Sequence, residues 1–145
     1  MQQNIAKEIQ NKTINFLITK GEKRKAIKIL KESLKIVNKG LKEENNLSYI
    51  LTKAVLNATP DVQVKTKRIG ATIYQIPKPI NQNKRLNHGI LNLIEASRNR
   101  SEKTMVLRLS SEITDAFNNK GEAVKKKEAV HKLAEASKAF AHFSF

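Results

Sequence analysis

Cysteine is absent from this chain of 145 residues, so disulfides and thiolate chemistry are excluded. No apolar run approaches the roughly 20 residues that a membrane-spanning helix requires. Residues 1–10 lack both the apolar core of a secretory signal and the arginine-rich, acid-poor character of a transit peptide. We therefore expect a protein that is made where it works or has already lost a leader, and that needs no membrane.

Acidic residues are few, and one long stretch has none. The chain holds 13 Asp and Glu against 28 Lys and Arg, which gives a formal charge of +15. No acid occurs from Val62 through Ile94. Such a field attracts polyanions, and we expect nucleic acid rather than an anionic membrane to be the partner.

Signatures of catalysis are missing as well. The sequence has no glycine-rich phosphate loop and no nucleophile elbow. Glu128, His131 and Glu135 have the spacing of a metal or acid–base group, but chance places such trios on helices rich in Glu and His, and no second helix offers matching ligands. His88 is predicted to be a packed or surface histidine. We expect no enzymatic activity, no metal and no other cofactor.

Apolar residues recur every three or four positions in six stretches, which is the pattern of amphipathic helices. The length suits one domain, residues 1–145, whose core needs no metal or disulfide. In the second stretch Lys28, Lys31, Lys35 and Lys39 point away from the apolar side. The predicted helices span residues 5–20, 22–39, 47–58, 83–100, 101–117 and 126–142.

For three of these helices, the sequence predicts how particular residues pack. Ile5 is expected to face the core from the first helix, and Leu133 and Phe140 from the last. Gly89 weakens the fourth helix by roughly 1 kcal/mol relative to alanine, unless close packing needs a glycine. The inward side of the last helix is predicted to consist of Val130, Leu133, Ala134, Ser137, Phe140 and Ala141.

Residues 61–77 alternate in polarity with a period of two, which predicts a β-hairpin with its turn around Gly70. Pro60 and Pro77 mark its ends. One face is predicted to carry Val62, Val64, Thr66 and Arg68, and the other Gln63, Lys65 and Lys67. The predicted fold class is therefore all-α, or mainly α, with a six-helix bundle and one protruding β-hairpin between the third and fourth helices.

Cations on the hairpin are candidates for contact with a polyanion. Lys65, Lys67 and Arg68 are suited to phosphates, while Tyr74 is suited to stacking on a base and Gln75 to hydrogen bonding with one. The alternative is a solvated edge ribbon whose lysines discourage aggregation. We favour contact, because a solvated ribbon normally mixes both signs of charge. The pattern does not separate RNA from DNA.

Basic clusters recur where helices begin or end. Taken singly each is as well explained by solvation, but their recurrence across a chain of charge +15 favours binding. On the last helix an outward stripe of Lys127, His131, Lys138 and His142 is suited to phosphate and sugar contacts or to solvent. The helix-end clusters are Lys20, Lys23, Arg24 and Lys25, then Lys84 and Arg85, and then Arg98, Arg100 and Lys103.

Three segments carry a family resemblance. The ending GEAVKKKEAVHKLAEASKAFAH at 121–142, the hairpin KTKRIGATIYQIP at 65–77 and the segment EASRNRSEKTM at 95–105 occur in the order and form typical of the small ribosomal subunit protein seven family of bacterial and organellar ribosomes. The chain resembles that family from about Ile14 to its C-terminus. Three motifs in the right order make coincidence very improbable.

The resemblance implies a fold of six helices with a β-ribbon between the third and fourth. It also implies a structural protein that binds the 3′ major domain of small-subunit ribosomal RNA (rRNA), nucleates assembly of the subunit head and brings its ribbon beside messenger RNA (mRNA) and exit-site transfer RNA (tRNA). Neighbouring head and platform proteins are further implied partners, and no homo-oligomer is expected. The implied basic contacts to RNA are Lys23, Arg24, Lys25, Lys65, Lys67, Arg68, Lys84, Arg85, Arg98, Arg100, Lys103, Lys125, Lys126, Lys127, Lys132 and Lys138.

The chain departs from the family pattern at several places. The family's basic N-terminal tail is missing, Ala71 replaces the second glycine of the hairpin turn, Asn92 stands in place of a tryptophan and Ser101 in place of a capping glycine. This drift, with Lys and Ile in place of Arg and Val, favours a mitochondrial ribosome. A bacterial cytoplasm or a plastid ribosome is the alternative.

Two other classes of protein share some of these features. An architectural DNA-bending protein also pairs a helical body with basic β-arms, but it inserts an apolar wedge near the arm tip, where this chain offers only Ile69. An RNA-modifying enzyme needs acid–base or nucleophilic groups that converge in a pocket. The resemblance decides against both.

Overall fold

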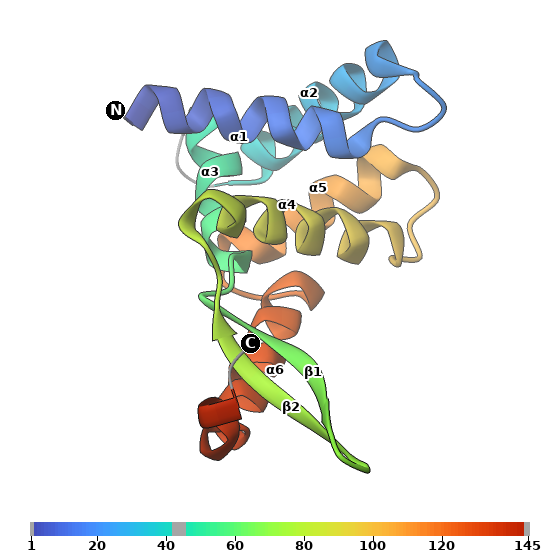
Figure 1. The fold of residues 1–145 in the computed structure, drawn as a ribbon. Helices are drawn as coiled ribbons and strands as arrows, with labels where there is room; N and C mark the ends of the chain where they lie inside the picture. The colour runs from blue at the N-terminus through green and yellow to red at the C-terminus, as the bar shows by residue number, and fades with distance from the viewer. Residues whose placement is uncertain (1, 42–45, 144–145) are drawn as a thin grey trace.

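The structure is a computed structural model that describes residues 2–41 and 46–143 (Figure 1). The described residues form six α-helices with an antiparallel hairpin between the third and fourth, as predicted. The elements are α1 (Gln2–Leu17), α2 (Lys23–Gly40), α3 (Leu47–Ala58), β1 (Val62–Ile69), β2 (Thr72–Pro79), α4 (Gln82–Arg98), α5 (Met105–Phe117), α6 (Glu122–Ala136) and the 3-10 helix η1 (Lys138–Phe143).

Helix α5 lies at the centre of the helical body, where it packs against α2, α3 and α4, while α1 covers α3 and α4. The buried side chains come from the apolar stripes that the sequence predicts, so burial of these stripes drives the bundle together. Among the described helices none is both long and apolar enough to cross a membrane. The largest fully buried apolar side chains of the body are Ile9, Leu30, Leu34, Ile50, Leu51, Ile90, Leu93, Ile94, Leu109 and Ile113.

The first helix lies three residues earlier than predicted. It ends at Leu17 because the chain then turns through left-handed backbone at Lys20 (φ 55°) and Gly21 (φ 75°), which a helix cannot follow. The expectation that Ile5 faces the core is wrong, since its side chain is 44% exposed. The buried side of α1 begins at Ile9, near the middle of the helix.

Helix caps set two other boundaries. Helix α5 begins at Met105 rather than at Ser101, because the Thr104 side chain accepts a hydrogen bond from the backbone N–H of Leu107 at 3.3 Å. In the same way the Asn46 side chain accepts from the backbone N–H of Ser48 at the start of α3. The sequence also predicts a polar loop over residues 42–46, of which 42–45 lie outside the described residues.

Gly89 marks the closest approach of α4 to the end of α3. A Cβ atom at this position would lie 2.2 Å from Oγ1 of Thr59 and 3.0 Å from the backbone oxygen of Val55. The Thr59 hydroxyl is already held in place, because it donates a hydrogen bond to that same oxygen at 2.7 Å. Close packing of α4 on α3 therefore requires a glycine at this position, despite its cost to the helix.

The last predicted helix is wrong in its bounds and in half of its buried side, since Ala134 and Ser137 are buried and Val130 is half-buried as predicted. Helix α6 begins at Glu122, after Gly121 with φ 90°, and ends at Ala136, where the 3-10 helix takes over. Leu133 and Phe140 are 40% and 36% exposed, and Ala141 is exposed. The reason is that α6 does not pack flat on the body. It extends from the body beside the hairpin, touching α4 at one end and β1 along its length (Figure 1).

The hairpin is longer than predicted. Its pairing runs from Val62 opposite Pro79 to Ile69 opposite Thr72, so β2 continues two residues beyond Pro77. The two turn residues are Gly70 and Ala71, and only Gly70 has a positive φ, at 63°. A type II′ turn requires positive φ only at its first central position, which explains why alanine is tolerated at the second.

Candidate nucleic-acid interface

The hairpin, α6 and η1 form one projecting unit (Figure 1). Helix α6 packs against β1, and η1 packs against β2. The Tyr74 and Phe140 rings lie 5.1 Å apart between their centroids, and Ile76 is fully buried. At the base of the unit the Asp61 backbone N–H donates to Nε2 of His131 at 3.1 Å. These contacts hold the hairpin in a defined direction, away from α1 and α2.

This packing determines where two of the residues predicted to contact RNA, His131 and Tyr74, lie. His131 is half-buried with one ring nitrogen joined to the hairpin, rather than standing on an outward stripe with Lys127 and Lys138. Tyr74 is half-buried against η1, so its ring belongs to the packing of β2. The side chain of His142, which lies within η1, is outside the described residues.

Cross-strand pairing distributes the hairpin cations over both faces. Lys67 pairs with Tyr74, whereas Arg68 pairs with Ile73 on the opposite face. Lys65 pairs with Ile76 and is exposed, and Arg68 is exposed with its Nε donating to the Gly70 oxygen at 3.2 Å. The predicted faces are therefore correct within β1. The pairing adds that Lys65 and Lys67 lie on the same face of the hairpin as the packed residues of β2, Tyr74 and Ile76. Gln75 is exposed on the other face.

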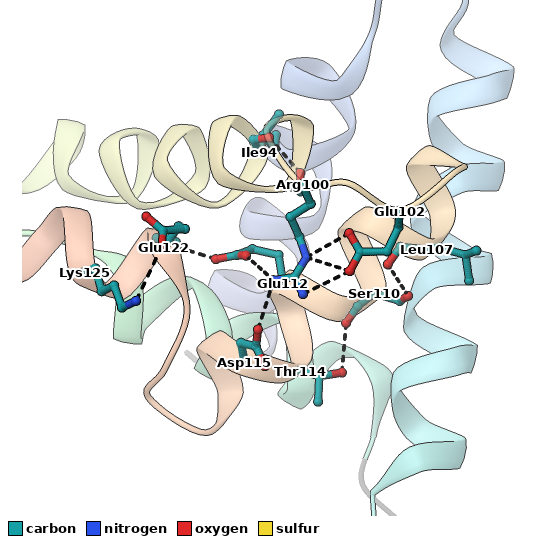
Figure 2. A network of polar contacts seen from close by, with 12 residues as sticks. Ile94, Arg100, Glu102, Leu107, Ser110, Glu112, Thr114, Asp115, Glu122 and Lys125 are labelled. Carbon is teal, nitrogen blue, oxygen red and sulfur yellow. Dashed lines mark hydrogen bonds and ion pairs between the residues drawn. The ribbon is translucent and has the colours of Figure 1, made fainter.

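Arg100 lies among three carboxylates rather than at the surface (Figure 2). Its Nη1 donates to Glu112 at 2.9 Å and to Asp115 at 3.0 Å, and its Nε donates to Glu102 at 3.1 Å. The Glu112 side chain is 0% exposed, and its other oxygen accepts the backbone N–H of Ala123 at 3.0 Å. This network joins the α4–α5 loop to α5 and to the first turn of α6, so Arg100 positions α6 and the hairpin that packs on it.

One feature of the sequence is a signal of this network. Glu112 directly precedes Ile113 and lies one helical turn before Ala116, both on the apolar stripe of α5. An acid on a buried stripe needs a cation or several donors to compensate its desolvation. The spacing does not show that Arg100 is that cation, because the loop after α4 must fold back over α5 to bring the two together.

Arg100 also changes the acid–base behaviour of its partners. Its hydrogen bond is the largest cause that holds the pKa of the Glu102 carboxyl below its ordinary value. In return the pKa of Arg100 is raised, first by Glu102 and then by Glu112 and Asp115, against the lowering effect of desolvation. The three carboxylates therefore favour the charged form of Arg100.

The lowered pKa of Glu102 predicts a loss of stability in acid. The carboxylate stabilises the fold fully above the ordinary pKa of a glutamate, about 4.3, and this contribution is lost as the pH falls through the lowered value. We expect the thermal midpoint of the wild type to fall on acidification by more than that of Glu102→Gln. Thermal unfolding followed by circular dichroism between neutral and acidic pH measures this, and identical pH profiles would contradict it.

Other predicted cations have partners within the protein. Arg85 forms an ion pair with Asp61, and Lys126 with Glu95 at 2.5 Å. Arg98 donates to the backbone oxygen of Phe16 at 3.3 Å. These groups are at least partly exposed, so the pairing is weak and leaves them able to exchange their present partner, a carboxylate or, for Arg98, a backbone oxygen, for a phosphate.

The remaining predicted cations are at the surface in two separate regions. Lys25 lies 3.1 Å from Glu22 and Lys125 3.5 Å from Glu122, both in exposed pairs. Lys127 is half-buried. Lys23 and Arg24 lie at the α1–α2 turn, at the end of the molecule away from the hairpin (Figure 1). The others that are exposed, on α4, in the α4–α5 loop and on α6 or η1, are Lys84, Lys103, Lys132 and Lys138.

A groove of about 710 Å³ runs between the end of α4 and the start of α6. Ala96 and Ala129 contribute its small side chains, and Lys125 and Lys126 its cations. Small side chains beside lysines let a sugar–phosphate backbone approach closely, which suits the groove to nucleic acid. Among residues 2–41 and 46–143, no three His, Asp or Glu side chains are placed to hold a metal ion.

Comparison with known proteins identifies the family. The family model described as Ribosomal protein S7p/S5e matches residues 1–138. The chain belongs to this family. The S7p/S5e match begins at residue 1, so the similarity extends further toward the N-terminus than the start near Ile14 that the motifs indicate.

Bacterial members of the S7p/S5e family resemble the chain over most of its length. The small ribosomal subunit protein uS7 of Shewanella sediminis is 44% identical over 136 residues, which is 94% of this chain and 86% of that protein. The uS7 protein of Porphyromonas gingivalis is 43% identical over 135 residues, or 92% of this chain and 85% of that protein. That of Parabacteroides distasonis is 42% identical over 133 residues.

Proposed function

We propose that this protein is a structural constituent of the small ribosomal subunit and that it binds rRNA. The family match over residues 1–138 carries this conclusion. The physical character of the chain agrees with it, because a charge of +15 on a small helical domain attracts a polyanion. The role is structural, as it is for the family, and we assign no reaction to the chain.

The finer proposal is that the protein binds the 3′ major domain of the rRNA and nucleates assembly of the subunit head. Cations for this contact are offered by the groove between α4 and α6, with Lys125 and Lys126, and by the exposed Lys65 and Arg68 of the hairpin. The Arg100 network supports it indirectly, since it holds α6 in place before RNA arrives. Binding then requires little ordering of the protein, which favours affinity.

The tip of the hairpin is proposed to reach toward exit-site tRNA and mRNA. Two observations support this placement. The hairpin projects beyond the helical body (Figure 1), and its base is tied to α6 through Asp61 and His131. Neighbouring head and platform proteins complete the proposed set of partners.

The proposed location is a mitochondrial ribosome, with a bacterial cytoplasm or a plastid ribosome as alternatives. The Lys- and Ile-rich composition and the departures from the family pattern support the first. The similar proteins named above are bacterial, which supports a bacterial cytoplasm as the alternative. Co-sedimentation of the purified protein with small subunits from each source, at physiological salt, tests both the proposed function and the proposed location. Failure to sediment with any of them would refute the function.

Removal of two hairpin cations should weaken binding through phosphate contacts. The variant carries Lys67→Ala with Arg68→Ala and is tested for binding to an rRNA head fragment. We expect the slope of log K against log salt concentration to become shallower by about 1–2 units, because a protein that makes fewer phosphate contacts releases fewer counterions when it binds. A filter-binding titration over a salt series measures the slope. The matched control is Lys7→Ala with Lys120→Ala, which removes the same charge from α1 and the α5–α6 turn. If the two double variants have the same slope, the hairpin does not contact phosphate.

A further inference from the structure

The two lysines of the groove between α4 and α6 are each paired with a glutamate. Lys126 of α6 lies 2.5 Å from Glu95 near the end of α4, so this ion pair connects the two helices that form the groove. Lys125 lies 3.5 Å from Glu122, which precedes it by three residues in α6 (Figure 2). The other side chains that line the groove are uncharged. The groove is therefore balanced in charge, although the whole chain carries +15.

This pairing distinguishes the groove from the other exposed cations of the proposed interface. Glu95 is the only acid of α4, and it directly follows the stretch from Val62 through Ile94 that has none. A surface that served only to attract phosphate would gain nothing from an acid here. Within residues 2–41 and 46–143, the exposed predicted contacts without a carboxylate partner include Lys84, Lys103, Lys132 and Lys138.

The fold does not depend on the pair between Glu95 and Lys126. Both side chains are 51% exposed, and an ion pair this exposed contributes little to stability. The start of α6 is held instead by the buried Glu112, which accepts the backbone N–H of Ala123 at 3.0 Å. The role of Glu95 therefore lies in what the groove binds.

A lysine beside a glutamate matches the backbone of RNA better than that of DNA. Each RNA nucleotide places a phosphate anion beside a ribose whose 2′-hydroxyl is able to donate a hydrogen bond. An ammonium group such as that of Lys126 binds the phosphate, and a carboxylate such as that of Glu95 accepts from the hydroxyl. DNA lacks this donor, so a carboxylate at the same place only repels its phosphates.

The walls of the groove permit a ribose to approach closely. Ala96 and Ala129 line it with small side chains, and the amide of Asn99 adds a group that both donates and accepts hydrogen bonds. Double-stranded RNA presents its 2′-hydroxyls in a wide and shallow minor groove, which proteins contact through sugar and phosphate rather than through base edges. The mixed charge of this groove suits such a surface.

We infer that Glu95 is a specificity-determining residue, which selects RNA over DNA by accepting a hydrogen bond from a ribose 2′-hydroxyl. The inference rests on the proposed function for the presence of nucleic acid in the groove. Glu122 repeats the arrangement beside Lys125 and offers a second acceptor. The carboxylate of Glu95 weakens the attraction of the groove for every polyanion, and only a ligand with a hydroxyl donor recovers the loss.

The test compares a short RNA duplex with a duplex of the same sequence in which fluorine replaces each 2′-hydroxyl. The fluorinated duplex keeps the phosphates and the A-form shape but has no donor on its sugars. In filter binding with the full chain, Glu95→Ala should reduce the preference of the wild type for the RNA duplex by about fivefold, the equivalent of one net hydrogen bond. Glu95→Gln should keep part of the preference, because its amide oxygen still accepts.

Glu8→Ala is the matched control. Glu8 is also 51% exposed and lies 2.7 Å from a lysine, Lys12, so its replacement removes the same charge and releases a lysine in the same way. This variant should bind both duplexes slightly more tightly and keep the wild-type preference. A preference that survives Glu95→Ala, or one that Glu8→Ala reduces equally, would overturn the inference.

Binding of the rRNA head fragment, measured on the same proteins, tests the proposed function separately. Wild type that fails to bind this fragment but has a preference between the duplexes that depends on Glu95 would refute the proposed function and support the inference. Wild type that binds the fragment but binds both duplexes equally would overturn the inference alone. Thermal unfolding of Glu95→Ala should match the wild type, because the lost ion pair is exposed.

Discussion

Arg100→Ala should lower the free energy of unfolding by about 3 kcal/mol, because it leaves the buried carboxylate of Glu112 without its cation. Glu112 is 0% exposed and also accepts the Ala123 backbone N–H, so it cannot turn toward water without releasing the start of α6. For a chain of this size the loss corresponds to a fall in the thermal midpoint of roughly 10 °C. Thermal and urea unfolding followed by circular dichroism measure it.

Arg98→Ala is the matched control for this experiment. Arg98 is exposed and makes one hydrogen bond, to the backbone oxygen of Phe16, so its loss should cost about 0.5–1.5 kcal/mol at most. Glu112→Gln should fall between the two, since its single amide oxygen can still accept from one of the two donors, Ala123 or Arg100, but not from both. A stable Arg100→Ala variant with RNA affinity lowered more than that of Arg98→Ala would show that Arg100 binds RNA rather than positioning α6.

Gly89→Ala should destabilise the protein by about 1–3 kcal/mol, although alanine is the better helix former. The added Cβ would lie 2.2 Å from Thr59 Oγ1 and 3.1 Å from Thr59 Cα. The hydroxyl is the end of a short side chain that already donates to the Val55 oxygen, and the other close atoms belong to the backbone. Relief therefore requires α3 and α4 to separate, which opens the core around Ile90.

Gly40→Ala provides the control for Gly89→Ala. Gly40 is also helical, at the end of α2, and nothing lies within 4 Å of the position a Cβ would take. Its replacement should be neutral or should stabilise the protein by up to roughly 1 kcal/mol. Adding Thr59→Ala to Gly89→Ala should recover only part of the loss, because Val55 remains 3.0 Å away. If Gly89→Ala unfolds at or above the wild-type midpoint, the close approach is wrong.

Local patterns in the sequence were enough for much of the fold. The period-two alternation around Gly70 located the hairpin, and the three-four spacing located α2, α3 and α4 to within two residues at each end. These patterns succeed because each element buries one side, and its period follows from backbone geometry alone. The last helix failed because its apolar side is divided among α4, β1 and β2, so no single continuous stripe describes its burial.

The candidate site was predictable only as a set of cations. Composition identifies residues that are able to bind phosphate. It does not show whether a given lysine or arginine faces solvent, a groove or a carboxylate. Arg100 and Lys103 lie three residues apart in one predicted cluster, yet Arg100 is enclosed by acids while Lys103 is exposed. The outward lysines of α2 were predictable from the sequence, but the separation of α2 from the hairpin was not.

By itself, then, the sequence determined the class of fold, the sign of the partner's charge and the family, because periodicity, net charge and motif order are properties of the chain read locally or summed. The tertiary structure alone decided which cations pair with groups of the protein itself and which are exposed to a partner. That choice depends on contacts between residues distant in the chain, such as Glu112 with Arg100 and Ala123 or Asp61 with His131. It also placed α2 and the tip of the hairpin at opposite ends of one molecule.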